Sequence, residues 1–313
     1  MLIYNLVFGT AGPGQVNCVF HDDTRASSGI GPNGEFNCFT CGAKAHNAIG
    51  FICKYFQVGF ERAKRIHYAM ERIQKYNYKK HPLDADQLKY LNGVGISTAI
   101  ANKYFFSSAV GKLTYAHTWS GIDVGYTWFN DSSLPNHNVG HPKYKYDKNN
   151  QGGSLSPMDD VLRYKTLILC EGEKDMLTAK SMGIVNAVAK IGGAKTWALA
   201  GKPLENKRII IVYDCDEWGR EGAIQDATNL INRFDCSVKI VDLGLQDKED
   251  LNDYFLKYGR SKQDFDGLIK ATPEYVPVPV VPQDKVQQYV ESLTDEEYNA
   301  LKNIIKIKDE EEN

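Results

Sequence analysis

The sequence predicts an α/β protein built around a parallel sheet, with an N-terminal zinc-binding β-ribbon and a short C-terminal helical tail. Apolar runs at residues 167–170 and 209–213 each end in carboxylates and are followed by a glycine and a helical pattern, as in βαβ units. Two close Cys/His pairs precede these runs. A proline-rich segment and a helix-capping sequence come after them. These observations indicate the order of the parts.

Length and composition fit two or three modest domains. The chain has 313 residues, of which 42% are hydrophobic and 24% are charged. No apolar run approaches the roughly 20 residues that span a bilayer, and residues 1–8 lack a basic secretory region. We therefore expect a β-strand over residues 1–8, a cytoplasmic location and no membrane contact. Seven cysteines, an odd count, favour a reducing compartment over a disulfide framework.

Charge is unevenly distributed along the chain. Residues 283–313 carry nine acids and four bases, or −5, so the rest of a chain with net charge −2 carries about +3. Between residues 62 and 80, seven basic residues accompany a single acid, Glu71. This stretch is compatible with binding to a phosphate backbone, and also with the solvated face of a helix. The seven are Arg62, Lys64, Arg65, Arg72, Lys75, Lys79 and Lys80.

The N-terminal part carries a metal-binding pattern. Cys18 and His21 form one close pair, and Cys38 and Cys41 form another after an intervening loop. A tetrahedral zinc site needs such pairs, because each pair turns tightly around the ion and the loop brings the pairs together. Hairpin turn signals between the pairs favour a β-ribbon. We expect His46 to lie in a surface loop.

Helices are expected between residues 48 and 104. One helix over 48–73 has an apolar stripe at three- and four-residue spacing. The polar segment 76–82 ends in a proline and predicts a linker. Further helices are expected over 87–91 and, N-capped by Ser97, over 98–104. The stripe consists of Phe60, Ala63, His67, Met70 and Ile73.

Residues 113–146 alternate polar residues with aromatic or β-branched ones, which predicts a small antiparallel sheet. In the last run, Lys143 and Lys145 project from one face, and the tyrosines at 144 and 146 from the other. The two lysines are suited to holding a triphosphate or a backbone phosphate. Protection of an exposed strand edge is the alternative. A flexible turn is expected over 149–154.

The central stretch predicts two further strands, over 185–191 and 238–243, and helices over 175–182 and from about 220 to 234. Carboxyl ends of parallel strands meet in one crevice, so we expect Glu171, Asp214 and Asp216 to share a site. Crowded carboxylates repel one another unless they hold cations. The pattern therefore predicts a Mg²⁺ site for phosphoryl chemistry. An acidic turn follows at residues 247–254.

The C-terminal part changes character at the proline-rich spacer over 276–282. Thr294 and Glu297 form a capping box that opens an amphipathic, acidic helix. Such a tethered helix is a candidate for docking a partner, and a frayed terminus is the alternative.

These residues resemble DNA primases of the bacterial and bacteriophage type. The Cys18, His21, Cys38 and Cys41 pattern looks like the zinc ribbon of that family, and Glu171-Gly172 followed by Asp214-x-Asp216-x-x-Gly219 looks like its Toprim pattern. Residues 248–253 are similar to a Lys-Asp-x-Asn-Asp/Glu turn of phage helicase-primases, with one extra residue after the lysine. The resemblance covers roughly residues 16–255.

The resemblance implies a domain order. It assigns 1–58 to a zinc β-ribbon, 59–85 to a basic helix and linker, and 86–275 to an RNA polymerase domain. That domain divides into an N-terminal subdomain over 86–164 and Toprim over 165–260, and the tail occupies 276–313.

The resemblance also implies a function, which is synthesis of short RNA primers on single-stranded DNA during replication. Structural Zn²⁺ and catalytic Mg²⁺ or Mn²⁺ are the expected cofactors. Phe36 and Phe39 of the ribbon are expected to stack on template bases. The implied catalytic residues are Glu171, Asp214 and Asp216, with Asp250 as a further magnesium ligand. The implied nucleotide- and template-binding residues are Lys143, Lys145, Lys174, Arg62 and Arg65.

Partners follow from the same resemblance. Template DNA and NTPs are expected, together with a separate replicative helicase and a single-stranded DNA-binding protein reached through the tail. The sequence contains no Gly-x-x-x-x-Gly-Lys-Ser/Thr loop, so we expect no helicase motor in it. The location expected for a phage-encoded protein is the host cytoplasm.

Two rival hypotheses use the same residues. One keeps the metal site and makes the protein a Toprim-type nuclease or topoisomerase-like enzyme. This hypothesis is weakened because no tyrosine stands out as a strand-linking nucleophile. The other is a non-catalytic zinc adaptor that recruits a replicative helicase. The presence of all three acidic positions disfavours it, because an inactive module has no need to confine that much negative charge.

Overall fold

The chain divides into two units, Met1–Tyr275 and Val276–Asn313. The structure is a computed structural model that describes residues 2–10, 12–76, 79–134, 136–146, 155–193, 201–277, 293, 294 and 297. The turn expected over 149–154 and the tail helix beyond Glu297 lie outside these residues. No helix among them is long and apolar enough to cross a membrane. In the second unit, Thr294 N donates to Glu297 Oε2 at 2.9 Å and Glu297 N to Thr294 Oγ1 at 3.4 Å, which confirms the capping box.

The N-terminal part contains a four-stranded antiparallel ribbon, with strand order β1-β2-β3-β4. Its strands are β1 (Gly14–Val16), β2 (Ser28–Ile30), β3 (Phe36–Cys38) and β4 (Lys44–Ala45). The β-strand expected over residues 1–8 is wrong, because Leu2–Phe8 forms the helix α1. Ile3, Tyr4 and Leu6 of α1 are buried, and the Tyr4 hydroxyl donates to the Gly34 carbonyl at 2.7 Å. Packing of this helix against the ribbon therefore overrides the β-propensity of an apolar run.

Two helices replace the single helix expected over 48–73. They are α2 (Ala48–Phe56) and α3 (Phe60–Tyr76). Gln57 ends α2 in the left-handed region, at φ 52°. The buried stripe of α3 also differs from the expected one, since Phe60 is 58% exposed and His67 is only half-buried. The buried positions of α3 are Ala63, Ile66, Ala69, Met70 and Ile73.

A second antiparallel sheet, in the order β5-β6-β7-β8, follows two short helices. It confirms the sheet expected over 113–146 and extends it by β5. The Ser97 side chain caps α5 as expected, accepting the Ile100 amide. The elements are α4 (Ala85–Gly93), α5 (Thr98–Tyr104), β5 (Phe105–Ser107), β6 (Leu113–Trp119), β7 (Ile122–Phe129) and β8 (Tyr144–Tyr146).

The predicted parallel sheet is present, in the order β13-β12-β10-β11-β9, with only β9 antiparallel to its neighbour. Its strands are β9 (Leu155–Ser156), β10 (Thr166–Cys170), β11 (Ala187–Lys190), β12 (Arg208–Val212) and β13 (Ser237–Ile240). The intervening and following helices are α6 (Met158–Arg163), α7 (Glu173–Ser181), η1 (Lys202–Leu204), α8 (Glu217–Phe234), α9 (Leu251–Leu256) and α10 (Lys262–Ala271).

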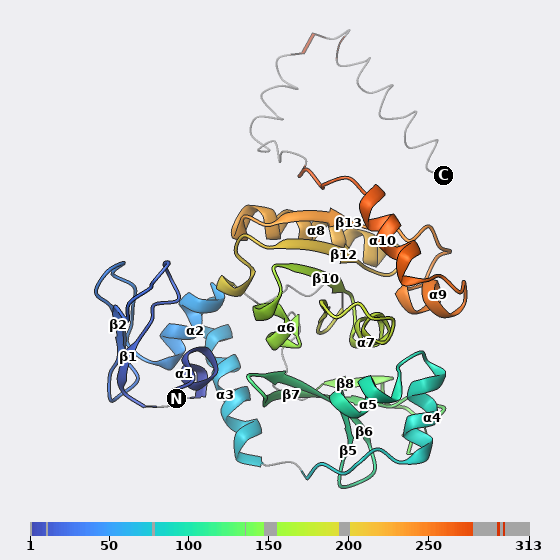
Figure 1. Cartoon of the computed structure of the whole chain (residues 1–313), viewed down its shortest axis with the longest axis horizontal. Coiled ribbons are helices and arrows are strands. Elements are labelled where there is room, and N and C mark those ends of the chain that lie inside the picture. The colour runs from blue at the N-terminus through green and yellow to red at the C-terminus, as the bar shows by residue number, and fades with distance from the viewer. Residues whose placement is uncertain are drawn as a thin grey trace. The chain divides into compact units, whose positions relative to one another are not determined.

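Both faces of the parallel sheet are covered, which explains why its strands are continuously apolar. Leu167 and Leu169 of β10 belong to a core shared with α6, α8 and the N-terminal helices. Ile168 and Cys170 point the other way, into a core shared with α7, α9 and the β5–β8 sheet. Figure 1 shows α7 between the two sheets. The sheet thus presents the residues that follow β10 and β12 at one edge, near α7.

Candidate functional site

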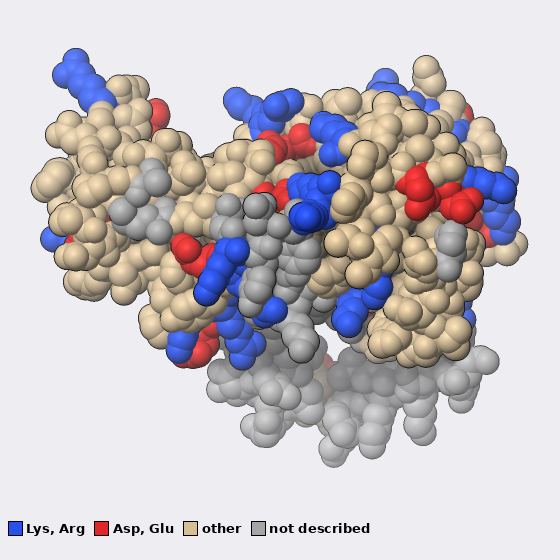
Figure 2. Space-filling model, turned by 90° about the horizontal axis from the view of Figure 1, so that it is seen from below, with Lys and Arg blue, Asp and Glu red and all other residues tan. Residues whose placement is uncertain are grey.

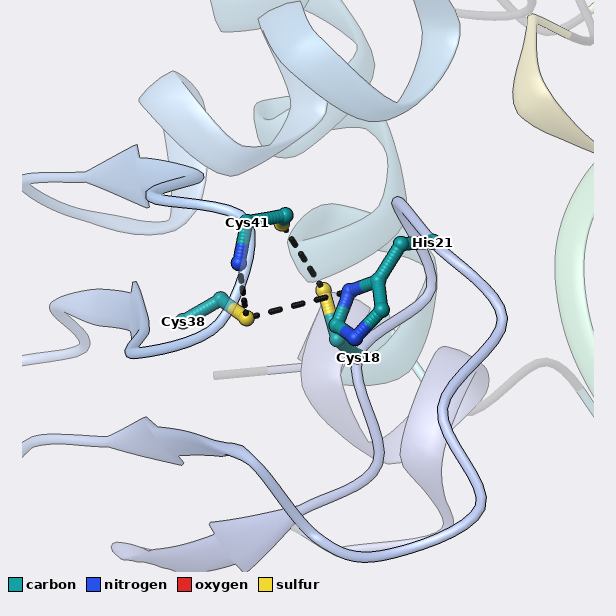
Figure 3. Close-up of side chains that lie close together, drawn as sticks. All are labelled: Cys18, His21, Cys38 and Cys41. Carbon is teal, nitrogen blue, oxygen red and sulfur yellow. Dashed lines mark hydrogen bonds between the residues drawn. The ribbon is translucent and has the colours of Figure 1, made fainter.

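The four predicted zinc ligands come together. The ligand atoms of Cys18, His21, Cys38 and Cys41 all lie within 4.8 Å of one another. Figure 3 shows the four side chains pointing toward one centre from two separate turns. Cys18 Sγ is 3.7 Å from Cys41 Sγ, and Cys38 Sγ is 3.9 Å from His21 Nδ1. Tetrahedral zinc with Zn–S bonds of about 2.3 Å places sulfurs about 3.8 Å apart, so this donor set fits Zn²⁺.

Asp23 organises the first turn of this zinc centre. Its Oδ2 accepts hydrogen bonds from the Cys18 amide at 2.6 Å and the Ser27 hydroxyl at 2.8 Å. These donors, the Cys18 amide above all, lower the pKa of Asp23 to about 2. Its Oδ1 lies 3.9 Å from Nε2 of His21, the ring nitrogen away from the metal position. A carboxylate in this place orients a ligating histidine.

The carboxylates predicted to share a crevice also meet, for a topological reason. β10 and β12 are parallel neighbours, and Cys170 is in register with Val212 at their ends. Glu171 and Asp214 therefore leave the sheet side by side, and the Asp214 amide donates to Glu171 Oε2 at 3.4 Å. Asp216 caps α8 by accepting the Gly219 amide at 2.7 Å. A Cβ atom at Gly219 would lie 2.2 Å from the Asp214 carbonyl oxygen, which explains the glycine.

Mutual repulsion marks this set as one electrostatic cluster. Burial, and then the charges of Asp175, Glu171, Asp250 and Asp216, raise the pKa of Asp214 to about 8. Burial and then the charge of Asp250 raise the pKa of Asp175 to about 7. Asp175 was not among the site residues expected from the sequence, although its place in the first turn of the helix that follows Glu171 was a signal for it. We call these five residues the carboxylate cluster.

Asp250 enters the cluster from the start of α9. Its Oδ1 accepts the Asp253 amide at 2.9 Å, and its Oδ2 lies 2.5 Å from Nζ of Lys174. Lys174, expected to bind nucleotide or template, thus neutralises Asp250 in this structure.

A buried ionic network adjoins the cluster. Nζ of Lys190 lies 2.5 Å from Asp226 Oδ2, which also accepts the Tyr213 hydroxyl at 2.6 Å. The three residues are 1%, 2% and 5% exposed, in the order Lys190, Asp226 and Tyr213. Burial lowers the pKa of Lys190, whereas Asp226 and then Glu171 favour its charged form. Sequence reasoning missed Lys190; its signal was a lysine inside a strand expected to be apolar.

The other predicted basic residues lie at β8 and on α3. Lys143 pairs with Asp131, with Nζ 3.2 Å from Oδ2. Lys145 is the cross-strand partner of Trp128, on the face of the β5–β8 sheet opposite Tyr144 and Phe129. Arg62 and Arg65 lie on α3, which packs against α2 and β7. Figure 2 shows Lys and Arg gathered near the middle of one face with carboxylates between them.

The two ribbon phenylalanines differ in exposure. Phe39 is 81% exposed, in the turn between Cys38 and Cys41. Phe36 is 1% exposed, with its ring 5.2 Å from that of Phe51. The expectation that both stack on bases is therefore wrong for Phe36, whose side chain belongs to the core.

Comparison with known proteins confirms the resemblance read from these motifs. Residues 168–255 match a family model described as Toprim-like. The DNA primase of Aquifex aeolicus (strain VF5) is 22% identical over 323 residues, covering 83% of this chain and 64% of that protein. The chain thus spans less than two thirds of the length of this relative.

One solved structure supports the fold class. The zinc-binding and RNA polymerase domains of the Aquifex aeolicus primase are 20% identical, with a TM-score of 0.50 and coverage of 85% of this chain and 80% of that one. The primase fragment of the bacteriophage T7 primase-helicase protein is 17% identical, with a TM-score of 0.43 and coverage of 81% and 98%.

Proposed function

We propose that this protein is a DNA primase that synthesises short RNA primers on single-stranded DNA by metal-dependent nucleotidyl transfer. The observation that carries the proposal is the carboxylate cluster. Burial, and then repulsion by the neighbouring carboxylates, raises the pKa of Asp214 to about 8, and a bound cation would relieve that repulsion. The zinc centre in the same compact unit supports a primase over other Toprim enzymes. The similarity to primases is independent support.

Glu171, Asp214 and Asp216 are the proposed Mg²⁺ or Mn²⁺ ligands, with Asp250 joining them when Lys174 moves away. The hard oxygen donors of such a set suit these ions. When bound, the metal stabilises charge at the α-phosphate and lowers the pKa of the attacking 3′-hydroxyl. The Gly219 amide fixes one oxygen of Asp216 and leaves Asp216 Oδ2 for the cation.

The basic residues have proposed roles in binding. Lys143, exposed at the edge of β8, binds nucleotide phosphates after leaving Asp131. Phe39, exposed beside the zinc centre, stacks on a template base. Arg62 is half-buried, and burial and the neighbouring Arg233 lower its pKa, so an incoming phosphate favours both cations.

The larger assembly is also a proposal. We assign residues 1–58 to the zinc domain, 59–85 to the basic helix and linker, 86–275 to the polymerase domain and 276–313 to a tail. The tail docks a separate replicative helicase, and a single-stranded DNA-binding protein prepares the template. The proposed location is the cytoplasm, or the host cytoplasm for a phage protein.

Primer synthesis tests the assignment. Purified protein is incubated with single-stranded DNA, labelled NTPs and Mg²⁺ or Mn²⁺, and the products are separated on a denaturing gel. We expect short RNA from the wild type and a loss of roughly 100-fold or more in Asp214→Asn, because the transition state loses a metal ligand. Asp266→Asn, at an exposed position on α10, is the matched control and is expected to retain synthesis.

Two results contradict the proposal. One is a wild-type protein that makes no RNA on any template, and the other is undiminished synthesis by Asp214→Asn. Cleavage of the DNA without RNA synthesis points to the nuclease hypothesis instead.

A further inference from the structure

The buried pair of Lys190 and Asp226 lies across the strand that leads to Glu171. β11 and β12 flank β10 on its two sides, so they are roughly 9–10 Å apart at the usual strand spacing. Nζ of Lys190, the last residue of β11, nevertheless lies 2.5 Å from the same Asp226 oxygen that accepts the hydroxyl of Tyr213. Nζ also lies 5.8 Å from the centre of the Tyr213 ring. The Lys190 side chain therefore reaches across β10.

Strand register places Glu171 between the two residues that bond to Asp226. The last residue of β10 is in register with Ala189 on β11 and with Val212 on β12. The residues that come next are Lys190 on β11, Glu171 after β10 and Tyr213 after β12. Glu171 therefore leaves the sheet with Lys190 on one side and Tyr213 on the other.

Electrostatic interactions show the order of the charges. Burial lowers the pKa of Lys190, and Asp226 and then Glu171 oppose that shift. Burial and Asp226, and then Glu171, raise the pKa of the Tyr213 hydroxyl. Burial raises the pKa of Asp226, and its contacts with Lys190 and Tyr213 oppose that shift. The Lys190 ammonium thus lies on the Glu171 side of the pair, and the Asp226 carboxylate lies on the far side.

A buried ammonium is a fixed charge, unlike an exposed one. Nζ of Lys174 also lies 2.5 Å from a carboxylate, that of Asp250, but the Lys174 side chain is 23% exposed and can move into water. The side chains of Lys190 and Asp226 are 1% and 2% exposed. Breaking such a pair leaves an uncompensated buried charge, so Lys190 stays in place. It presents the same positive charge to the carboxylate cluster with or without a metal ion.

A fixed cation beside a metal-binding carboxylate has two effects. It stabilises the metal-free cluster by offsetting repulsion between the carboxylates, and it repels an incoming divalent cation. Both effects weaken binding of the bare ion. Mg²⁺ commonly completes its coordination with substrate phosphates, so a site weakened in this way depends on phosphate oxygens for firm binding.

We propose that Lys190 is a positioning residue, which holds a fixed positive charge beside Glu171 and lowers the affinity of the carboxylate cluster for Mg²⁺ and Mn²⁺. Asp226 and Tyr213 keep its ammonium in place. The proposal rests on the proposed function, because the metal site that Lys190 acts on is the one assigned there. It deepens that function by naming a residue that controls the metal without binding it.

Titration of Mn²⁺ into the zinc-loaded full chain tests the proposal without DNA or nucleotides. Electron paramagnetic resonance measures the free ion, whose signal is lost on binding. The double variant Lys190→Met with Asp226→Leu removes both charges and leaves neither uncompensated. We expect it to bind Mn²⁺ about tenfold more tightly than the wild type, because the repelling charge is gone. Lys190→Arg keeps the charge and is expected to keep the wild-type affinity.

A second buried pair provides the matched control. Nζ of Lys180 lies 2.7 Å from Asp160 Oδ2, and the two side chains are 3% and 10% exposed. The largest influences on the pKa of Lys180 are burial and Asp160, which does not belong to the carboxylate cluster. The double variant Lys180→Met with Asp160→Leu is therefore expected to leave Mn²⁺ affinity unchanged.

Thermal stability gives a second measurement of the same affinity. An ion that binds only the native state stabilises it more when it binds more tightly. We expect Mg²⁺ to raise the Tm of the variant Lys190→Met with Asp226→Leu more than that of the wild type. Circular dichroism identifies a variant that has lost its fold. Lys190→Gln with Asp226→Asn, which keeps hydrogen-bonding groups and removes both charges, then carries the test and is expected to show the same gain.

Two results overturn the proposal. One is a Mn²⁺ affinity in the neutral-pair variants equal to or below that of the wild type, which is the result for a pair with a purely structural role. The other is an equal gain in the Lys180 control, because the effect then does not come from a charge beside Glu171.

The same preparations separate this proposal from the proposed function. A wild type that binds no Mn²⁺ refutes both the metal site and the role of Lys190. A wild type that shows the expected metal affinities but synthesises no primer refutes the primase assignment and leaves the role of Lys190 standing. Primer synthesis with unchanged Mn²⁺ affinity in the variants has the opposite meaning.

Discussion

Lys190 and Asp226 form a buried ion pair beside the carboxylate cluster. An ammonium and a carboxylate that are 1% and 2% exposed are stable together only because each satisfies the other, with Tyr213 adding a hydrogen bond. The pair also brings a positive charge close enough to Glu171 to influence the carboxylate cluster. It therefore offsets part of the repulsion there.

Removing one member of this pair is expected to be costly. Lys190→Met leaves Asp226 buried without its cation, and we expect the free energy of unfolding to fall by about 3–5 kcal/mol in urea titrations. The double variant Lys190→Met with Asp226→Leu removes both charges and is expected to recover most of that loss. The single variant Asp226→Leu is measured as well. If the double variant loses as much free energy of unfolding as the two single variants added together, the two residues do not act as a pair.

At the scale of elements, the zinc ribbon is poorly able to fold by itself. Its four strands have two or three residues each, too few for independent stability in water. Asp23 and the amide hydrogen bonds to the cysteine sulfurs, from Phe20 and Cys41 at 3.4 Å each, shape the two turns around the ligand atoms. The metal supplies the remaining cross-link.

Removal of zinc is therefore expected to unfold the ribbon selectively. After chelation, or in Cys38→Ser, we expect rapid proteolysis within residues 12–45, with the parallel sheet still protected. Zinc release is followed with a colorimetric chelator. Cys53→Ser, at a half-buried cysteine outside the zinc centre, is the control and is expected to keep its zinc. Equal protease resistance with and without metal would show that the ribbon does not depend on zinc.

At the scale of the whole unit, a buried polar chain joins the β5–β8 sheet to helix α7. Nε2 of His117 lies 2.8 Å from Thr127 Oγ1, and Thr127 donates to Glu173 of α7 at 2.9 Å. Burial lowers the pKa of His117 to about 3, so the ring is neutral in the fold. Glu173 lies 3.7 Å from the same nitrogen, and burial raises its pKa.

His117 makes stability fall as pH falls. In the unfolded chain a histidine has a pKa of about 6.5. Below that pH, His117 is therefore protonated in the unfolded state and stays neutral in the native state. Its contribution is complete above about pH 6.5 and decreases by about 1.4 kcal/mol per pH unit toward the folded pKa of about 3. Glu173 acts in the opposite direction, because its raised pKa favours proton uptake by the native state.

Urea titrations from pH 7.5 to pH 4.5 check this dependence. We expect His117→Asn, whose amide can still reach Thr127, to lose less stability than the wild type over this range, by about 2–3 kcal/mol. Parallel curves for the two proteins would show that His117 is not the group responsible.

The candidate site was predictable from sequence where its spacing is local. Cys18 and His21, and Cys38 and Cys41, are close pairs whose turns present ligands to one ion whatever surrounds them. Glu171, Asp214 and Asp216 were placed together by the rule that parallel strands end at one edge, and the structure shows Asp214 and Glu171 in contact. Their metal-binding role stays a prediction.

The sequence by itself determined the zinc ligands, the parallel sheet and the strands that present the carboxylates, because each depends on spacing within one or two elements. Tertiary structure decided the rest. It made residues 2–8 a helix, buried Phe36, brought Asp175 into the cluster and paired Lys190 with Asp226. It also placed Lys145 beside Trp128 and Arg72. These outcomes depend on partners far along the chain, whose contribution to packing and electrostatics no local pattern contains.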